Sequence, residues 1–107
     1  MKEDKYIERI VSYATKIIRY LEEVKSIEDF TENDEKIDAV LLNLEQIGET
    51  AKKIGEQYRV LYPNIEWNKI IGLRNLISHE YEGVDVTLIY NVASINIPNL
   101  LKALLDK

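Results

Sequence analysis

Residues 4–25, DKYIERIVSYATKIIRYLEEVK, decide the fold class because their apolar positions repeat every seven residues. The repeat makes three adjacent rows: Ile7, Ala14 and Leu21; Ile10, Ile17 and Val24; and Val11 with Ile18. A repeat close to two helical turns places these rows on one side of an α-helix, opposite the charged residues. The stretch therefore predicts a long amphipathic helix with one broad apolar face.

A second long segment, residues 34–60, continues in the same register. Its rows are Ile37, Leu44, Ala51 and Tyr58; Val40, Ile47, Ile54 and Leu61; and Leu41, Gly48, Gly55 and Tyr62. A glycine inside a helix costs about 1 kcal/mol relative to alanine, so we expect another helix to approach closely at Gly48 and Gly55. Pro63 ends the segment, since proline cannot continue the interior of a helix.

Three shorter helices are expected in the rest of the chain. The first spans residues 64–78, and the second begins after Asp85, a favourable N-cap, and runs to about Ile95. Pro98 fits best in the first turn of a helix, so we place a break at residues 96–97 and a last helix from Pro98. The fold class is therefore all-α, an up-down bundle of about five helices dominated by two long antiparallel ones.

The composition fits one globular domain covering residues 1–107. Hydrophobic residues make up 46% of the chain, and its 4 glycines and 2 prolines are too few for the turns of an all-β sandwich. Without cysteine the chain has no disulfide scaffold, thiolate zinc site or cysteine nucleophile. We find no signal peptide and no apolar run of membrane-spanning length, and expect a cytoplasmic protein that does not bind membranes.

The net charge is −5, from 14 basic and 19 acidic residues. An acidic protein is not drawn to nucleic acid as a whole, so any such binding must come from a local cluster. Four basic residues offer a modest basic edge, although scattered lysines are usually just solvated: Lys52, Lys53, Arg59 and Lys69.

One short stretch, residues 72–81 (GLRNLISHEY), is unlike ordinary bundle packing. Arg74 falls near the middle of the apolar arc of its helix, where an unpaired charge would be expensive. His79 is the only histidine, and its ordinary pKa of about 6.5 suits proton transfer at neutral pH. Tyr81 adds a hydroxyl. A cation, a proton-transfer group and a hydroxyl together suit cleavage of RNA through its own 2′-hydroxyl, which needs no metal.

The spacing of this pair sets a geometric condition. Arg74 and His79 are five positions apart, which is about 140° around an unbroken helix. They converge only if the helix distorts or ends before His79, or if a second protomer contributes. One histidine per chain points to the same answer, because a homodimer would supply two Arg–His pairs.

Residue types alone leave ordinary explanations open. His79 would also serve to cap the carbonyls at a helix end, Arg74 to carry its charge out to water, and Tyr81 to pack in the core. Glu45 and Glu49 lie four apart on one helix, as in the carboxylate metal sites of bundles, but without the histidine partner those sites need. A solvated acidic face explains them, and no metal is expected.

The pattern Arg74-Asn75-x-x-x-His79-x-Tyr81 resembles the R-x4-H-x-Y signature of the HEPN superfamily, most closely that of the HepT-like toxins of bacteria and archaea. Further marks lie on both sides of it. Residues 43–51 (NLEQIGETA) resemble the second-helix segment of the family, residues 63–75 (PNIEWNKIIGLRN) its lead-in to the signature, and Val84-Asp85 with Ile97-Pro98 its last two helices. The resemblance covers nearly the whole chain.

This resemblance implies a HEPN-like bundle that acts as a metal-independent endoribonuclease toxin without a cofactor. Arg74 and His79 would be the catalytic pair, with Asn75 and Ser78 as polar neighbours, in a cleft shared by the two protomers of a homodimer. The antitoxin would be an MNT-type nucleotidyltransferase that silences the toxin by adding AMP to the Tyr81 hydroxyl. RNA is then the substrate, and no DNA binding is expected.

Two other classes of function stay open. HEPN-like bundles also resemble non-catalytic partners that dock onto a nucleotidyltransferase, and a structural bundle would have no chemistry at all. The intact set Arg74, His79 and Tyr81 favours the ribonuclease. A docking module would not need all three residues, and a structural bundle would leave the apolar surroundings of Arg74 unexplained.

Overall fold

The computed structural model describes residues 2–79 and 85–106, except for the side chains of residues 75, 76, 78 and 79. Its helical elements are α1 (Lys2–Glu22), α2 (Ile27–Thr31), α3 (Asp34–Lys52), α4 (Glu56–Arg59), α5 (Trp67–His79), α6 (Val86–Asn91), the π-helical turn η2 (Val92–Asn96) and α7 (Ile97–Leu105). Within these described ranges the chain has no β-strand. The prediction of an all-α protein is confirmed.

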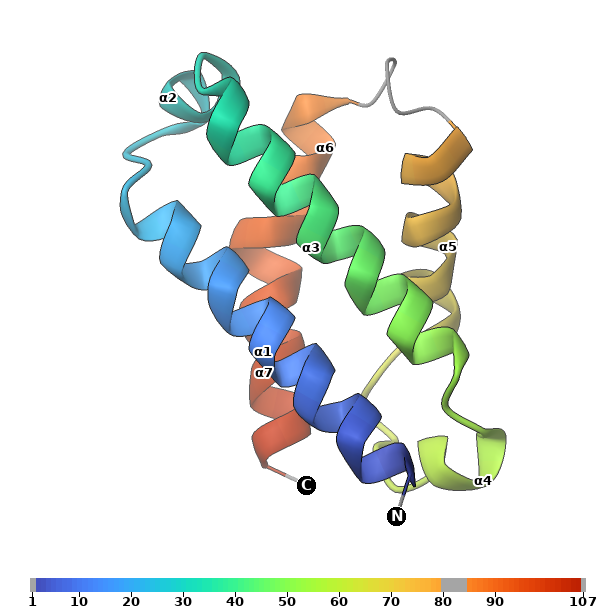
Figure 1. Cartoon of the computed structure of the whole chain (residues 1–107). Coiled ribbons are helices and arrows are strands. Elements are labelled where there is room, and N and C mark those ends of the chain that lie inside the picture. The colour runs from blue at the N-terminus through green and yellow to red at the C-terminus, as the bar shows by residue number, and fades with distance from the viewer. Residues whose placement is uncertain (1, 80–84, 107) are drawn as a thin grey trace.

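The helices form an up-down bundle (Figure 1). α1 runs up and α3 runs back down beside it, so the two long antiparallel helices are as predicted. α5 runs up along the other side of α3. The chain then descends through α6, η2 and α7, here called the last arm, which packs against α1.

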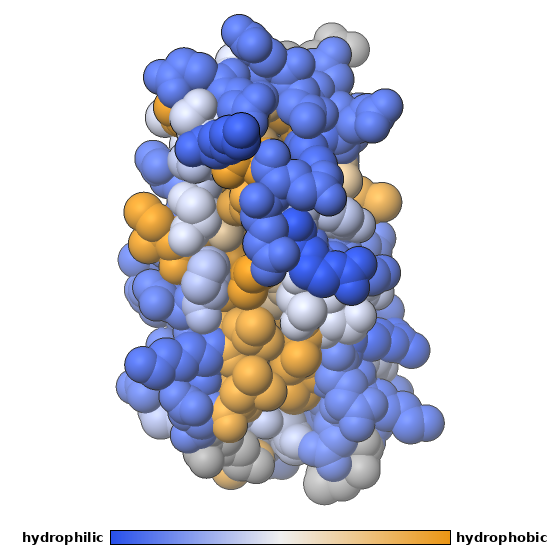
Figure 2. All heavy atoms as spheres, turned by 90° about the vertical axis from the view of Figure 1, so that its left-hand side faces the viewer, coloured by the Kyte–Doolittle hydropathy of each residue, from blue (hydrophilic) through white to orange (hydrophobic). Residues whose placement is uncertain are grey.

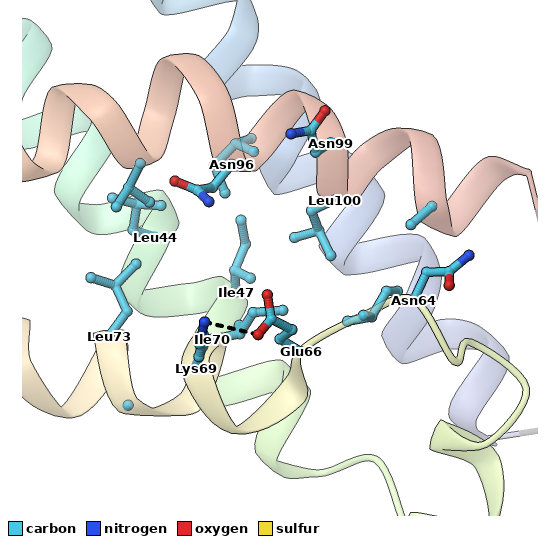
Figure 3. A pocket seen from close by; sticks show the side chains of 15 residues that line it. Leu44, Ile47, Asn64, Glu66, Lys69, Ile70, Leu73, Asn96, Asn99 and Leu100 are labelled. Atoms are coloured by element: carbon cyan, nitrogen blue, oxygen red, sulfur yellow. Dashed lines mark ion pairs between the residues drawn. The ribbon is translucent and has the colours of Figure 1, made fainter.

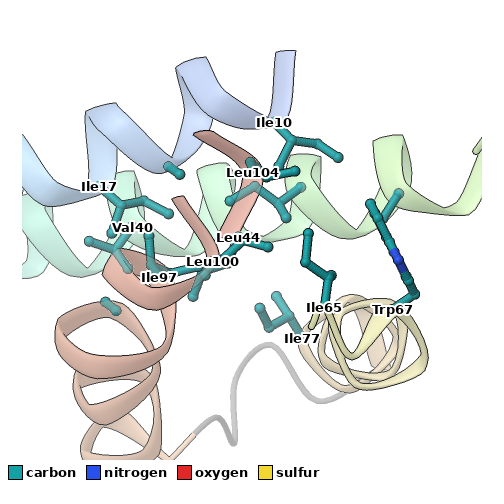
Figure 4. Packing of buried hydrophobic residues seen from close by; sticks show 14 of the residues in the cluster. Ile10, Ile17, Val40, Leu44, Ile65, Trp67, Ile77, Ile97, Leu100 and Leu104 are labelled. Carbon is teal, nitrogen blue, oxygen red and sulfur yellow. The ribbon is translucent and has the colours of Figure 1, made fainter. Parts of the chain in front are cut away.

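The core lies between α1, α3 and the last arm, and the start of α5 closes one end of it (Figure 4). The helical rows predicted for α1 are confirmed, because its buried residues are Ile7, Ile10, Ala14 and Ile17. Further members of the cluster come from α3, α5, the last arm and the segment before α5, among them Val40, Leu44, Ile65, Trp67, Ile77, Ile97, Leu100 and Leu104. Full burial of one such aliphatic side chain stabilises the fold by about 1.5–3 kcal/mol.

The second long helix is shorter than predicted. α3 ends at Lys52, so the expectation of one helix over residues 34–60 was wrong. The chain turns at this point and enters the short helix α4, with Gly55 as its extended N-cap. The apolar rows continue past Lys52 because Ile54 is buried from within the turn. The seven-residue repeat therefore identified buried positions correctly, although these positions do not all lie on one continuous helix.

Arg59 in α4 holds this turn against the end of α3. Its Nε donates to the Ile54 carbonyl at 2.9 Å, and one terminal nitrogen donates to the Ala51 carbonyl at 3.2 Å. Its guanidinium also lies 5.8 Å from the centre of the Trp67 ring. The last turn of a helix leaves carbonyls without an intrahelical partner, and Arg59 supplies donors for two carbonyls at this end.

The last arm remains helical where a break was expected. Asp85 caps α6 as predicted, because its side chain accepts from the amides of Thr87 and Leu88. Instead of breaking at residues 96–97, the chain widens into the π-turn η2 and continues as α7, with Pro98 in the first turn. Proline has no amide hydrogen to donate, and a π-turn is one way for a helix to accommodate the missing bond.

The last arm also departs from the expectation that the chain has no apolar run of membrane-spanning length. Val86–Leu105 is a continuous helical stretch of 20 residues with a mean hydropathy of 1.2, long and apolar enough to cross a membrane by length and composition. Core helices of water-soluble proteins meet the same criterion. Five residues of this stretch are buried in the core: Ile89, Ala93, Ile97, Leu100 and Leu104.

One side of the molecule carries an apolar strip between two hydrophilic flanks (Figure 2). This is the side on the left of Figure 1, where α1 and the last arm lie next to each other. Hydrophobic residues of both elements are only partly buried against the core, among them Val11 and Ile18 of α1 and Leu101 of α7. Hydrophilic residues cover most of the remaining surface in this view.

Candidate active site

Arg74 lies on the face of α5 that packs against α3. Ile77 and Trp67, about one and two helical turns from Arg74 on the same face, are buried, as the 3.6-residue period requires for one side of a helix. The side chain of Arg74 is 26% exposed. The structure thus agrees with the predicted position of Arg74 within the apolar arc.

Gly48 of α3 makes room for Arg74. A Cβ atom at position 48 would lie 2.1 Å from the Arg74 Cβ and 3.2 Å from the Ile70 carbonyl oxygen, which is too close for any side chain. The predicted close approach of a helix is therefore confirmed at Gly48. At Gly55 it was wrong, because a Cβ there would meet nothing within 4 Å.

The guanidinium of Arg74 is held by the next residue of α3. The Nε of Arg74 forms an ion pair with the Oε1 of Glu49, whose side chain is 36% exposed. Both side chains of this ion pair are partly buried, so salt screens it less than an ion pair on the open surface. An unpaired charge within the apolar arc would be expensive, and Glu49 supplies the partner of Arg74.

Glu49 is the site residue that sequence reasoning missed. It was assigned, together with Glu45, to a solvated acidic face, and for Glu49 that assignment was wrong. A usable signal was present, because Gly48 marks the point where α3 is approached by another helix. A carboxylate next to such a glycine is well placed to meet a cation on the incoming helix.

His79 is the last residue of α5, which is an unbroken α-helix from Trp67 onward. The possibility that the helix ends before His79 is thereby removed. Positions 74 and 79 are separated by about 140° around the helix axis. The side chains of Asn75, Ser78 and His79, and the whole of Tyr81, lie outside the described part of the chain.

A cavity of about 440 Å³ opens on another side of α5, between that helix, α3 and the last arm (Figure 3). Its apolar floor includes Leu44, Ile47 and Leu100, and three asparagines line it as well: Asn64, Asn96 and Asn99. An ion pair of 2.9 Å joins Lys69 and Glu66 at the cavity. Arg74 does not line this cavity.

The basic edge considered in the sequence analysis is split among separate local contacts. Arg59 caps α3, Lys69 pairs with Glu66, and the ammonium of Lys53 lies 5.9 Å from the centre of the Tyr6 ring. Among the side chains that the structure describes, no three acidic, histidine or cysteine residues gather as a metal site would require. Arg74 with Glu49 is thus the charged pair that the fold builds at the predicted motif.

The sequence model of the family described as "Ribonuclease HepT-like" matches residues 5–106. A Methanocaldococcus jannaschii protein named "Putative RNase" is 36% identical over 93 residues, which are 87% of this chain and 79% of that protein. A Thermococcus cleftensis protein named "Probable ribonuclease HepT" is 33% identical over 95 residues, 89% of this chain and 86% of that protein. No solved structure matches the chain.

Proposed function

The chain belongs to the HepT-like ribonuclease family, and we propose that it is a cytoplasmic toxin that cleaves RNA internally without a metal ion. The 2′-hydroxyl of the RNA attacks the adjacent phosphorus, and the bond to the 5′-oxygen breaks. The products are a 2′,3′-cyclic phosphate and a free 5′-hydroxyl. The observation that carries this proposal is the position of Arg74. The fold holds its guanidinium on the face of α5 that packs against α3, where the positive charge can stabilise an anion.

Each catalytic group has a defined task in this reaction. One base must take the proton of the 2′-hydroxyl, and one acid must give a proton to the leaving 5′-oxygen. His79 is the only histidine in the chain, so it provides one of these groups. Arg74 stabilises the extra negative charge of the pentavalent phosphorus, and Asn75 and Ser78 are polar neighbours of the pair.

A homodimer would allow Arg74 and His79 to act together although their positions face different directions on one helix. Because α5 is unbroken through His79, positions 74 and 79 face different directions within one chain. Two copies of α5 facing each other across a cleft would bring the Arg74 of one protomer toward the His79 of its partner. The same arrangement supplies two Arg74–His79 pairs, each made of residues from both protomers.

Regulation would act on Tyr81. A cognate MNT-type nucleotidyltransferase transfers AMP from ATP to the Tyr81 hydroxyl, two residues after His79 in the sequence, and pyrophosphate leaves. The added nucleotide brings a negative charge and considerable bulk next to a cationic site. It therefore excludes RNA both by repulsion and by size.

The experiment is expression of the chain in growing cells, alone and together with the nucleotidyltransferase. We expect the wild type alone to arrest growth, and His79→Ala to lose this effect while it still folds and still binds the nucleotidyltransferase. Tyr81→Phe should arrest growth even when the nucleotidyltransferase is present. Mass spectrometry should find one AMP on the co-expressed wild type and none on Tyr81→Phe.

Two results would replace this proposal. If the wild type binds the nucleotidyltransferase but never arrests growth, the chain is a non-catalytic docking partner. If His79→Ala fails to fold, as judged by circular dichroism and thermal melting, His79 has a structural role. Arg74→Ala is then the variant that tests whether the chain is a toxin. Position 74 lies more than one turn before the end of α5, so this substitution leaves the end of the helix unchanged.

A further inference from the structure

Two consecutive residues of α3 determine where Arg74 sits. Gly48 lets the backbone of α5 come so close that the Arg74 Cβ occupies the space of a missing side chain. Glu49 then meets the other part of the same side chain, with Oε1 on Nε. α3 therefore fixes the positions of both the Cβ atom and the guanidinium of Arg74.

Pairing through Nε has a particular geometric effect. The guanidinium is planar and rigid, so holding its Nε also sets the direction of the two terminal nitrogens. An arginine without such a restraint distributes over many rotamers of its long side chain. A carboxylate on Nε therefore selects one orientation of the whole group before any anion arrives.

We propose that Glu49 is a positioning residue that orients Arg74 for the transition state of RNA cleavage. This inference rests on the proposed ribonuclease function. Preorganised charge is most effective where negative charge develops during the reaction, because no reorganisation is needed at that moment. The contribution of Glu49 thus belongs to the chemical step more than to the binding of RNA.

The experiment compares Glu49→Gln with Glu23→Gln in the purified, full-length protein. Glu23, just after α1, forms an ion pair with Lys36 of α3. The control therefore removes one carboxylate from a different ion pair without touching Arg74. We expect Glu49→Gln to lower kcat by about tenfold to a hundredfold, the range associated with a misplaced catalytic group. KM should change little, and Glu23→Gln should keep the wild-type kcat.

A second measurement separates positioning from a purely structural role. The Nε–H resonance of Arg74, assigned by its loss in Arg74→Lys, should be shifted and slow to exchange with water in the wild type. In Glu49→Gln it should exchange faster, while the melting temperature stays close to that of the wild type. A structural role would lower the melting temperature instead and leave kcat unchanged per folded molecule.

The outcomes distinguish this inference from the function on which it rests. If the wild type cleaves RNA and Glu49→Gln has the same kcat, Glu49 does not position Arg74 and the ribonuclease function stands. An equal loss of kcat in Glu23→Gln also overturns the inference, since the effect would then be one of general charge. If the folded wild type does not cleave RNA at all, the proposed function fails first, and the role of Glu49 in catalysis fails with it.

Discussion

Gly48 of α3 lies in close contact with Arg74 of α5. A Cβ atom at Gly48 would come within 2.9 Å of the Arg74 Cγ and still closer to its Cβ. The backbone fixes the position of the Arg74 Cβ atom, so no rotamer change can move that atom away. The contact therefore requires glycine at position 48 on steric grounds.

The prediction at Gly48 uses a second glycine as its control. Gly48→Ala forces α3 and α5 apart and should lower the free energy of unfolding by about 1–3 kcal/mol, the usual cost of overpacking. A Cβ at Gly72 in α5 meets nothing within 4 Å. Gly72→Ala should therefore raise the free energy of unfolding by up to about 1 kcal/mol, through helix propensity. Urea unfolding of both variants measures this, and a stabilising Gly48→Ala would contradict the account.

Sequence reasoning reached Arg74 but not its partner. An arginine within an apolar arc is conspicuous, so it was predictable that its charge needs a pairing group, a stacking partner or an anion. Glu49 was not found because a glutamate at the edge of an apolar row looks like any solvated acid. Only the crossing point of the two helices, set by Gly48, identifies which acid faces the arginine. The predicted roles of His79 and Tyr81 stay predictions.

At the scale of elements, the junction between α3 and α4 depends on Arg59. Its guanidinium donates to the carbonyls of Ile54 and Ala51. We expect Arg59→Ala to lower the free energy of unfolding by about 1.5–3 kcal/mol, the value for hydrogen bonds to charged groups. Lys52→Ala removes an exposed cation from the last turn of α3 and should change stability far less. Thermal melts measure both variants. If Arg59→Ala and Lys52→Ala lowered the melting temperature equally, Arg59 would contribute only its charge and not its hydrogen bonds.

α4 is also tied to the start of α1. The hydroxyl of Tyr58 donates to the Asp4 carboxylate. This hydrogen bond, with a smaller contribution from desolvation, raises the pKa of Tyr58 to about 12 from its ordinary value of 10.0. The protonated phenol is the form that the folded state prefers. Its stabilising effect is therefore complete below pH 10 and is lost as the pH rises toward 12.

The corresponding test measures urea unfolding of the wild type and Tyr58→Phe at several pH values. Below pH 10 the wild type should be the more stable protein. The difference should shrink between pH 10 and 12, as Tyr58 ionises in the folded state. Tyr13→Phe serves as a tyrosine control on α1. A stability difference that stays constant to pH 12 would show that the Asp4 hydrogen bond does not matter.

The helical elements were predictable where the buried rows follow a straight helix, as in α1. The end of α3 was not, because Ile54 continues the seven-residue row from inside a turn. The junction in the last arm was also missed. Pro98 argues for a break when only α-helical hydrogen bonds are considered, whereas η2 absorbs it by widening one turn. Periodicity identifies which residues are buried, but it does not show how the backbone reaches them.

At the scale of the whole molecule, the unbroken course of α5 predicts a site shared between protomers. Arg74→Ala and His79→Ala should each be inactive alone. After mixing and subunit exchange, a heterodimer regains one cleft with an intact Arg74 from one protomer and an intact His79 from its partner. Random pairing makes about half of the dimers mixed, each with one working site of two, so the mixture should recover about a quarter of wild-type cleavage. No recovery despite subunit exchange would place both residues of each site on one chain.

The central claim is that Arg74 and His79 cleave RNA without a metal. The most direct measurement is cleavage of RNA by the purified, unmodified protein in the presence of a chelator, with the wild type beside His79→Ala. The account predicts cleavage by the wild type alone, with 2′,3′-cyclic phosphate ends on the products. Cleavage that needs an added metal ion, equal cleavage by His79→Ala, or no cleavage by the folded wild type would contradict it.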